Sequence, residues 1–323
     1  LGKLQHCSNL YFSEPCAKLA EALCERTGMK KVFFGNSGAE ANECAIKAAR
    51  KYAADKYGPE RCKIVTLVNS FHGRTIATLT ATGQEEMHKD FQPLVPGFIY
   101  TPANDCEALR KLVAEHDDIA AFMFELVQGE GGVMPLEQSF VDCMVEIAKA
   151  KDILLVCDEV QTGNGRTGSL YAWMQYGFKP DIMSTAKGLG GGLPIGACLF
   201  GEKTEHVLTA GTHGSTFGGN PVVCAGALTI LDRIDDKLLA DVKAKSAYLF
   251  EAFTGAPGIK AVTGMGLMIG LQTEKPAAEV VAACMANGVL VLTAHGRVRL
   301  LPALNIPMEL VKKAAEVIRA ACA

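Results

Sequence analysis

Short apolar runs alternate with longer mixed segments along most of the chain, and this alternation predicts its secondary structure. We expect strands over the apolar runs at 31–34, 64–68, 119–124, 153–156, 182–184 and 197–200. Helices are expected from Ser37 and over about 140–149, between those runs. Strands that are apolar throughout and separated by helices are typical of a mainly parallel sheet covered on both faces. The pattern therefore predicts an α/β fold.

The pattern changes near residue 235. Helical patterns at 225–234 and 236–253 are followed by the breaker run 255–258, strands near 262 and over 267–271, a helix over about 277–287 and a last helix from Met308. This segment has its own order of strands and helices, as a separate domain would. We therefore expect a large α/β domain over 1–235 and a smaller α+β domain over 236–323.

Composition and charge exclude several classes of protein. Hydrophobic residues make up 49% of the 323 residues and charged residues 21%, a balance typical of a globular protein. The net charge of −3 and the lack of a Lys/Arg-rich run argue against nucleic acid as a partner. The longest apolar stretches, such as 119–124, are far shorter than the ~20 residues of a membrane helix. We therefore expect a soluble protein without a nucleic-acid or membrane partner.

The twelve cysteines are scattered, with no Cys-x-x-Cys pair and no Cys/His cluster at metal-ligand spacing. Cys44 shares a predicted helical face with Ala41 and Ala48, and Cys157 lies in an apolar run, so both are interpreted as small core residues. Free core cysteines fit a reducing compartment better than a disulfide framework does. The sequence thus predicts a cytoplasmic protein without a metal site.

Ligands of open α/β sheets bind at the carboxyl ends of the strands, so polar residues that follow an apolar run are candidate site residues. After the first run, Ser37 stands at the expected helix N-cap and Glu40 follows three residues later, which is the pattern of a capping box. Gly38 and Ala39 leave the first backbone N–H groups accessible, with the helix dipole behind them. An ordinary helix cap and a phosphate-binding helix start both fit this pattern.

Asp158 follows the apolar run at 153–157. A carboxylate at the end of a buried strand needs a cation or good hydrogen-bond donors. Three interpretations compete: a structural ion pair, a magnesium-binding acid of a nucleotide hydrolase, and an acid that holds a protonated ring nitrogen of a cofactor. The second requires a Gly-x-x-x-x-Gly-Lys-Ser/Thr loop, which the sequence lacks. The first and third stay open.

The segment 163–168 has the spacing Gly-x-Gly-x-x-Gly directly after a predicted strand, which by itself suggests a dinucleotide fold. The fingerprint also requires an acid at the end of the following strand. Asp181 instead precedes its strand. A nicotinamide-dependent oxidoreductase is therefore disfavoured and is kept only as the alternative that this spacing suggests.

Lys187 follows a predicted strand and precedes the glycine-rich run 188–192. Burial at the end of a strand would lower the pKa of the lysine and favour the neutral amine that forms Schiff bases. The glycines allow a bulky group to approach the backbone. Together with the helix start at Ser37, the acid Asp158 and the aromatic Phe71, Lys187 predicts a pyridoxal phosphate pocket.

These motifs resemble the class III (fold type I) aminotransferases, and within them the acetylornithine aminotransferase group. The matching segments, in the order of the family, are Ser8-Asn-Leu-Tyr11 with Glu14-Pro15, Asn36-Ser-Gly-Ala-Glu-Ala-Asn42, Phe71-His-Gly-Arg-Thr75, Gln128-Gly-Glu-Gly-Gly132, Asp158-Glu-Val-Gln161, Gly165-Arg-Thr-Gly168, Lys187-Gly-Leu-Gly-Gly-Gly192, His213-Gly-Ser-Thr-Phe-Gly-Gly-Asn-Pro221, and Arg299 before Leu300-Leu-Pro302. The resemblance covers nearly the whole chain. It implies a fold type I large domain, a smaller C-terminal domain and pyridoxal 5'-phosphate as the cofactor.

The resemblance also implies a role for each cofactor residue. Lys187 matches the lysine that forms the Schiff base and then moves the substrate proton, and Asp158 matches the residue paired with the ring nitrogen, so these two are the expected catalytic residues. The other expected cofactor-binding residues are Ser37, Gly38 and Ala39 at the phosphate, Phe71 and His72 at the ring, Gln161 near the phenolic oxygen, and Thr216, which in the family reaches the phosphate of the neighbouring subunit. A homodimer is therefore implied.

Three charged residues match the substrate-binding groups of the family. Arg299 resembles the arginine that binds the α-carboxylate of glutamate, and Glu130 resembles the acid that masks it when an ω-amino group is bound. Arg74 resembles the arginine that binds the α-carboxylate of the acylated amino acid. Arginine suits this task because its planar guanidinium binds carboxylates with two hydrogen bonds. Amino acids and 2-oxo acids are the implied substrates.

The resemblance implies a transaminase that moves the δ-amino group of N2-acetyl-L-ornithine to 2-oxoglutarate in arginine biosynthesis. Enzymes that act on ornithine, N-succinylornithine or 4-aminobutyrate share the cofactor residues, so these donors stay open as alternatives. The chain has Glu125-Leu126 where the family usually has Glu-Pro. Leu1 matches a point inside the family's length, so we expect the family's N-terminal segment to be absent. A truncated homologue that binds the cofactor without turnover is the other alternative.

Overall fold

A computed structural model describes residues 2–323 of the chain, whose contacts divide it into two compact units. Unit 1 comprises the residues up to Glu125 together with Glu137–Gln161 and Tyr176–Arg233. Unit 2 comprises Leu126–Leu136, Thr162–Gln175 and Ile234–Ala323.

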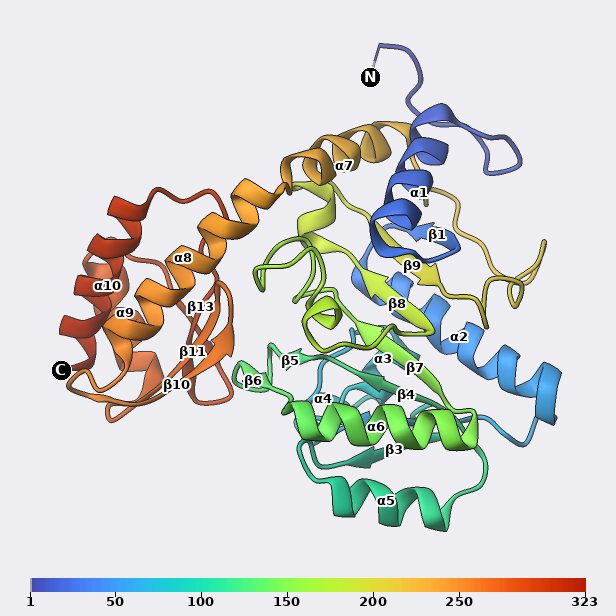
Figure 1. Ribbon diagram of the computed structural model, residues 1–323, viewed down its shortest axis with the longest axis horizontal. Coiled ribbons are helices and arrows are strands. Elements are labelled where there is room, and N and C mark those ends of the chain that lie inside the picture. The colour runs from blue at the N-terminus through green and yellow to red at the C-terminus, as the bar shows by residue number, and fades with distance from the viewer. Residues whose placement is uncertain (1) are drawn as a thin grey trace. The chain divides into compact units, whose positions relative to one another are not determined.

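The centre of unit 1 is a seven-stranded sheet (Figure 1). Its strands, in spatial order, are β1 (Lys31–Gly35), β9 (Gly196–Phe200), β8 (Ile182–Thr185), β7 (Leu154–Asp158), β4 (Ile119–Phe124), β2 (Lys63–Leu67) and β3 (Phe98–Thr101). Neighbouring strands from β8 to β3 are parallel, whereas β9 runs antiparallel to both β1 and β8. The prediction of a mainly parallel α/β sheet is confirmed.

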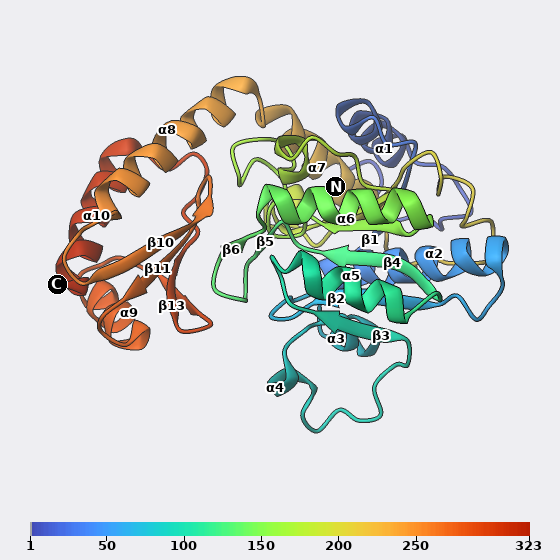
Figure 2. The ribbon, with the colours of Figure 1, turned by 60° about the horizontal axis from the view of Figure 1, so that its bottom comes forward.

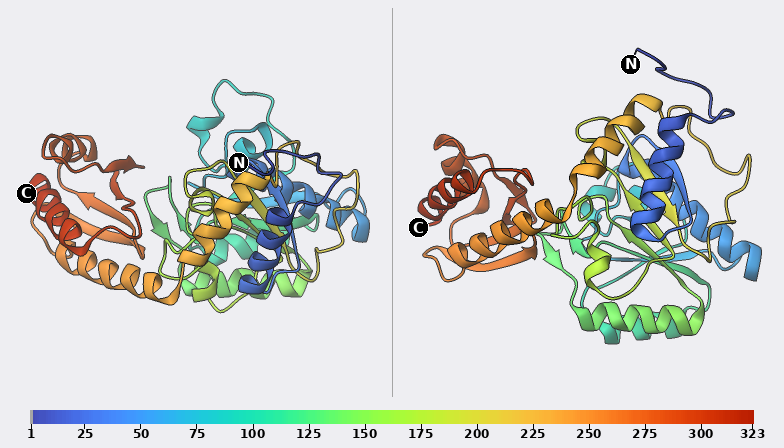
Figure 3. Two further views of the ribbon diagram at one scale, coloured as in Figure 1. Left: turned by 90° about the horizontal axis from the view of Figure 1, so that it is seen from above. Right: turned by 45° about the horizontal axis from the view of Figure 1, so that its top comes forward.

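Helices cover both faces of this sheet, which is why β4 and β7 are buried along their whole length. The helices of unit 1 are α1 (Glu14–Thr27), α2 (Gly38–Tyr57), α3 (Ile76–Ala81), α4 (Glu85–His88), α5 (Cys106–Glu115), α6 (Gln138–Lys151) and α7 (Pro221–Arg233). Helix α2 crosses one face and contacts β1, β4, β7, β8 and β9. Helices α5 and α6 lie side by side on the opposite face (Figure 2), and α1 packs against α7 (Figure 3).

The reversed direction of β9 brings its first residue to the edge of the sheet where β1, β7 and β8 end. Gly35 at the end of β1 pairs with Gly196 at the start of β9, and Thr185 at the end of β8 pairs with Ala197. Asp158 is the last residue of β7. The segments that follow β1, β7 and β8 therefore start from one edge, which is where α/β sheets bind ligands.

Unit 2 contains a four-stranded antiparallel sheet in the order β10 (Ile259–Met265), β11 (Met268–Thr273), β13 (Arg297–Leu300), β12 (Leu292–Ala294). Its helices are α8 (Asp236–Phe253), α9 (Ala277–Ala286) and α10 (Met308–Cys322). Apolar residues of these helices and of the sheet form one core. The expected smaller α+β C-terminal part is confirmed as a fold.

The last and longest segment of unit 2 begins at Ile234. Unit 2 also includes two earlier segments, Leu126–Leu136 and Thr162–Gln175, which lie within the range 1–235 expected for the large domain. Unit 1 is therefore not one continuous stretch of chain. The first segment forms a hairpin, β5 (Val127–Gln128) and β6 (Met134–Pro135), that packs on β10. In the second, the backbone oxygen of Arg166 accepts a hydrogen bond of 2.9 Å from Leu267 N. Such long-range contacts leave no trace in local hydrophobic patterns.

All twelve cysteines are free, and Cys44 and Cys157 are buried, as their interpretation as core residues predicted. Over residues 2–323 no helix is both long enough and apolar enough to cross a membrane.

Candidate active site

A cavity of about 540 Å³ lies in unit 1, with Asp158 at the end of β7 and Lys187 just after β8 in its wall. The predicted site residues that line it are Ser37, Gly38, Ala39, Phe71, His72, Arg74, Asp158, Gln161 and Lys187. Thr216, Glu130 and Arg299 are not among its lining residues. Side chains from four separate segments of the chain thus meet around one cavity.

The start of α2 forms one wall of the cavity. Ser37 is the N-cap, and its Oγ accepts a hydrogen bond from Glu40 N (3.2 Å). The expected capping box is only half formed, because the Glu40 carboxylate accepts instead from Asn36 N (2.8 Å), one residue before the cap. By helical geometry the N–H groups of Gly38 and Ala39 have no carbonyl within the helix to bond, so they are available to an anion.

Two glycines allow the backbone to pack tightly around this helix start. A Cβ atom at Gly38 would lie 2.7 Å from Val160 Cγ1, and one at Gly196 would lie 2.0 Å from the carbonyl oxygen of Ser37. Both distances are below any normal contact distance, so neither position has room for a side chain. The close approach of β9 therefore holds Ser37, the N-cap residue of α2, in place.

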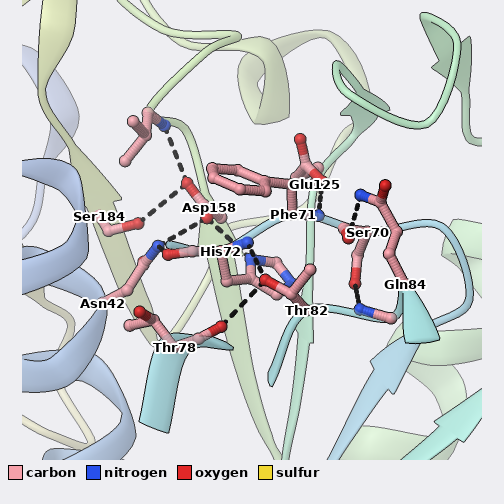
Figure 4. A network of polar contacts seen from close by, with 12 residues as sticks. Asn42, Ser70, Phe71, His72, Thr78, Thr82, Gln84, Glu125, Asp158 and Ser184 are labelled. Atoms are coloured by element: carbon pink, nitrogen blue, oxygen red, sulfur yellow. Dashed lines mark hydrogen bonds and ion pairs between the residues drawn. The ribbon is translucent and has the colours of Figure 1, made fainter. Parts of the chain in front are cut away.

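Asp158 is 3% exposed and lies at the centre of a polar network (Figure 4). Its Oδ2 accepts from Asn42 Nδ2 (2.7 Å) and lies 2.8 Å from His72 Nδ1, and its Oδ1 accepts from Val160 N (3.0 Å) and Ser184 Oγ (3.3 Å). None of these partners is a lysine or an arginine. Of the two interpretations left open by the sequence, a structural ion pair would therefore have to involve His72.

Lys187 differs from the prediction in one respect. The sequence argument placed it in a buried position, but the residue is exposed and lines the open cavity. Strand β8 ends two residues earlier, at Thr185, and Lys187 begins a short 3-10 turn, Lys187–Gly190. Its φ is 46°, a left-handed conformation that is unusual for a lysine. The expected burial of Lys187 is therefore wrong.

The backbone of Phe71 is fixed by a hydrogen bond, and its ring is in contact with a cation. Its N–H donates to Glu125 Oε1 (2.8 Å), a carboxylate that is almost fully buried. The guanidinium of Arg74 lies 5.3 Å from the centre of the Phe71 ring, within the range of a cation–π contact. Arg74 itself is exposed, so it can bind an incoming anion.

Thr216 lies in a second hollow of unit 1, of about 340 Å³, which Asn36, Glu40 and Phe217 also line. Asn36 lines both hollows, so the two are adjacent. Thr216 is exposed. Its expected role at the phosphate of a neighbouring subunit stays a prediction.

Glu130 and Arg299 form an ion pair within unit 2. Arg299 Nη1 lies 2.8 Å from Glu130 Oε1 and donates to Gly129 O (3.2 Å). Arg299 lies on β13, and Glu130 lies in the turn between β5 and β6. The pairing expected from the resemblance is thus present in the structure.

The segment 163–168 does not form a dinucleotide fingerprint, the alternative that its spacing suggested and that the sequence analysis disfavoured. It folds as a series of turns in unit 2, and no α-helix follows it before β8. The backbone N–H of Leu155 donates to Asp181 Oδ2 (2.9 Å), which gives that acid a structural partner before its strand begins. The fingerprint needs a helix N-terminus for the pyrophosphate, and this segment has none.

The sequence reasoning missed Asn42, Glu125 and Val160, which all line the cavity. Asn42 lies on α2 at a buried helix position, where an amide that must be satisfied is itself a signal. Glu125 ends an apolar strand in the same manner as Asp158, and the same rule would have identified it. Val160 is found only from the contact that it makes with Gly38.

The residues of the cavity fit pyridoxal 5'-phosphate, which has a phosphate, an aldehyde and a ring nitrogen. Gly38 and Ala39 at the start of α2 would bind the phosphate, and Lys187 would bond the aldehyde. Asp158 would hold the ring nitrogen in its protonated form, because a buried carboxylate without a lysine or arginine partner is stabilised by a cation. Among residues 2–323 no three His, Cys, Asp or Glu side chains are grouped as a metal site.

Comparisons with known proteins agree with this geometry. A family model described as "Aminotransferase class-III" matches residues 1–322. The acetylornithine aminotransferase of Haemophilus ducreyi is 49% identical over 320 residues, which is 98% of this chain and 81% of that protein. The solved N-acetylornithine aminotransferase of Stenotrophomonas maltophilia superposes with a TM-score of 0.86 at 36% identity, over 99% of this chain and 82% of that one.

A solved ornithine aminotransferase of Toxoplasma gondii, described as having partial occupancy of PLP at its active site, superposes with a TM-score of 0.94. It is 32% identical, and the match covers 99% of this chain and 79% of that one.

Proposed function

Because the chain belongs to the class III aminotransferase family, whose cofactor is pyridoxal 5'-phosphate, we propose that it is an acetylornithine aminotransferase. The reaction moves the δ-amino group of N2-acetyl-L-ornithine to 2-oxoglutarate. The products are N-acetyl-L-glutamate 5-semialdehyde and L-glutamate, as arginine biosynthesis requires. Curated relatives with this name are 43–49% identical over most of the chain.

One observation supports the proposal more than any other. The buried acid Asp158, the amine Lys187 and the free N–H groups at the start of α2 all line one cavity of unit 1. These three groups match the ring nitrogen, the aldehyde and the phosphate of a single cofactor molecule. No other described cavity of unit 1 has this set of residues in its wall.

The residues of the chain have separate tasks in the proposed reaction. When bound, the cofactor supplies an electron-poor ring that stabilises negative charge on the substrate carbon. Asp158 keeps the ring nitrogen protonated, and Phe71 packs on the ring. Lys187 Nζ takes the proton from the substrate carbon that loses the amino group and would deliver it to the carbon that derives from the cofactor aldehyde, and this general acid–base step is worth about 10²–10⁴-fold in rate.

Arginines select the substrates. Arg74 binds the α-carboxylate of the acylated amino acid, and Arg299 binds the α-carboxylate of glutamate or 2-oxoglutarate. Glu130 stays paired with Arg299 while the ω-amino donor is bound, because the ω-amino end of the donor has no carboxylate for Arg299 to bind. The two half-reactions thus use different arginines.

A kinetic panel tests the proposal. Activity with 2-oxoglutarate is measured for N2-acetylornithine, N2-succinylornithine, ornithine and 4-aminobutyrate. We expect kcat/KM for N2-acetylornithine to be at least about tenfold above the values for the other donors. A site that forms hydrogen bonds to the acetyl group of the substrate discriminates against donors that do not carry this group. A preference for ornithine would favour the second candidate, which the similarity to the Toxoplasma gondii enzyme supports. No turnover of any donor would support a homologue that only binds the cofactor.

The variant Lys187→Ala tests the proposed role of Lys187 as the catalytic amine. The substitution should lower turnover by on the order of 10³-fold, and borohydride treatment should no longer attach the cofactor to the protein. Lys89→Ala, at an exposed lysine outside the cavity, should leave both properties unchanged. Full activity of Lys187→Ala would overturn the assignment of the catalytic amine.

We also propose that the enzyme is a cytoplasmic homodimer in which Thr216 contributes across the interface. Leu10, Tyr11, Phe12 and Phe217 are exposed large apolar residues of unit 1. The backbone oxygens of Ser215 and Gly218 accept hydrogen bonds from Asn9 Nδ2, at 2.7 and 2.9 Å, so the two segments form one surface beside Thr216. Exposed apolar surface of this kind is typical of a protein interface. The twelve free cysteines support a reducing compartment.

Light scattering tests the dimer. The wild-type enzyme should have twice the mass of one chain, and Phe12→Ser combined with Phe217→Ser should shift it toward the monomer. Leu290→Ser, at an equally exposed apolar residue of unit 2, is the control and should stay dimeric. A monomeric wild-type protein at all concentrations would contradict the proposal.

A further inference from the structure

The imidazole of His72 makes the closest approach of any ring to the Asp158 carboxylate in the described network. Its Nδ1 lies 2.8 Å from Asp158 Oδ2, the oxygen that also accepts from Asn42 Nδ2 at 2.7 Å. The side chains are enclosed, with exposed fractions of 0% for His72 and 3% for Asp158. A contact this short between two side chains with so little exposure to solvent is a hydrogen bond with a defined donor and a defined acceptor.

The donor and acceptor of this contact follow from the charge of Asp158. An ionised carboxylate has no hydrogen to donate, so beside an ionised Asp158 the hydrogen of the contact is on His72 Nδ1. The other ring nitrogen, Nε2, is buried and has no hydrogen-bond partner within residues 2–323. In a neutral ring, this arrangement defines the Nδ1–H tautomer, in which Nε2 is an acceptor without a hydrogen.

The backbone of His72 is fixed on both sides, so the ring cannot easily turn away. Its N–H donates to Thr82 Oγ1 (2.9 Å), and its carbonyl oxygen accepts from Asn42 Nδ2 (2.7 Å). Thr82 Oγ1 in turn donates to Thr78 O (3.0 Å) in helix α3. Figure 4 shows how these bonds join α2, α3 and the 70–72 segment around Asp158. Asn42 thus holds both the histidine backbone and the carboxylate.

We propose that His72 is a positioning residue for Asp158: as the Nδ1–H tautomer, it fixes the carboxylate in the orientation that pairs with the ring nitrogen of the cofactor. The inference rests on the proposed function, since it assumes that Asp158 binds that nitrogen. His72 acts through Asp158 and takes no part in the proton transfer at the substrate carbon. Nδ1 is the atom that performs this task, and Nε2 is not required for it.

Two amide variants distinguish the two ring nitrogens. In His72→Asn the amide nitrogen takes the place of Nδ1, and in His72→Gln it takes the place of Nε2. We expect His72→Asn to bind pyridoxal 5'-phosphate within about threefold of the wild type. His72→Gln and His72→Phe should bind it about ten- to a hundredfold more weakly, because they lose a hydrogen bond to a charged group. His206→Asn, at an exposed histidine, is the control and should bind as the wild type does.

Two measurements test the proposal without any turnover. The dissociation constant of pyridoxal 5'-phosphate is obtained by titration of each apoprotein, after thermal unfolding has shown that the variant is folded. Long-range ¹⁵N–¹H NMR of histidine-labelled apoprotein identifies the tautomer, and His72→Asn assigns the signal among the seven histidines. We expect the Nδ1–H form for His72.

The outcomes are separable. An Nε2–H tautomer, weaker binding by His72→Asn than by His72→Gln, or equal binding by all three variants would each overturn the proposal. If His72→Phe fails to fold, the proposal is still tested by the tautomer of His72 and by the comparison of cofactor binding between His72→Asn and His72→Gln. Neither readout involves an amino-acid substrate, so a failure of N2-acetylornithine as donor would leave this result intact, and the reverse also holds.

Discussion

Glu130 Oε1 lies 2.8 Å from Arg299 Nη1, and the two partners are enclosed to very different extents: the Glu130 side chain is 32% exposed and that of Arg299 is 8% exposed. The carboxylate can therefore move toward solvent while the guanidinium stays in place. Arg299 Nε is buried and has no hydrogen-bond partner in the described part of the chain. Under the proposed function, this Nε–H is a donor that a substrate carboxylate would use.

Glu130→Ala should favour glutamate over the ω-amino donor. The variant removes the internal competitor for Arg299, so kcat/KM for glutamate should rise about three- to tenfold relative to that for N2-acetylornithine, as expected for a partly exposed ion pair. Stopped-flow measurement of each half-reaction gives the two values separately. Glu130→Gln keeps the shape without the charge and should shift the ratio in the same direction. An unchanged ratio in both variants would mean that Glu130 does not mask Arg299.

Gly196→Ala should destabilise the protein and weaken cofactor binding. The added Cβ would lie 2.0 Å from the carbonyl oxygen of Ser37, a backbone atom that cannot simply rotate away. Overpacking of this kind costs about 1–3 kcal/mol, and here it would displace the phosphate-binding start of α2. Urea unfolding and cofactor titration measure the two effects. Gly2→Ala, where the added atom meets nothing within 4 Å, is the control; equal behaviour of the two variants would show that β9 does not support the cap.

Asp152→Asn should destabilise the protein near neutral pH and much less in acid. Asp152 Oδ2 accepts from Lys56 Nζ (2.7 Å), Tyr57 Oη (2.6 Å) and Tyr52 Oη (3.0 Å), and Lys203 Nζ lies 3.5 Å from Oδ1. Burial alone would raise the pKa of this carboxyl, but the hydrogen bonds from Lys56, Tyr57 and Tyr52 outweigh burial and hold the pKa well below its usual range. Asparagine is the suitable replacement because the residue has a left-handed φ of 49°.

The sign of the pH effect follows from this lowered pKa. A group whose pKa is lower in the folded state stabilises the protein above its unfolded-state pKa, near 3.8, and loses that contribution as the pH falls. We expect the variant to lose about 1–2 kcal/mol at pH 7, with a difference that narrows below pH 4 or so. Urea unfolding at several pH values measures it. Asp55→Asn, in an exposed pair with Lys51, should have a much smaller effect; a constant difference at all pH values would argue against the charge as its cause.

Much of the fold follows from local patterns. The buried strand β4 is apolar at every position and β7 at every position before Asp158, and the cap at Ser37 is visible in the sequence because only a few residue types are preferred at an N-cap. The C-terminal helices were predicted by the same periodicity. The affiliation of β5 and β6 with unit 2 was not predicted, because it depends on a contact with β10 that is more than a hundred residues away.

The site was predicted less completely than the fold, and Lys187 and Asn42 show why. The chemistry of Lys187 is predicted from the residue type, but its exposure and left-handed φ depend on how the chain leaves β8. Asn42 is marked locally only as an amide on a buried helix face, and its two partners, His72 and Asp158, are far away in sequence and cannot be identified from that signal. Residue types thus reveal which reactions are possible, whereas the tertiary contacts decide which atoms face each other.

The direction of β9 has a consequence for the connection that precedes it. The pairing of Thr185 with Ala197 closes residues 186–196 into a loop tethered at both ends to a single edge of the sheet. Lys187 lies next to one tether, and Gly196, in contact with the Ser37 carbonyl, is at the other. The spacing between Lys187 and the start of α2 is therefore set by the length of one short connection, so an insertion or deletion there should disturb both of the proposed attachment points of the cofactor at once.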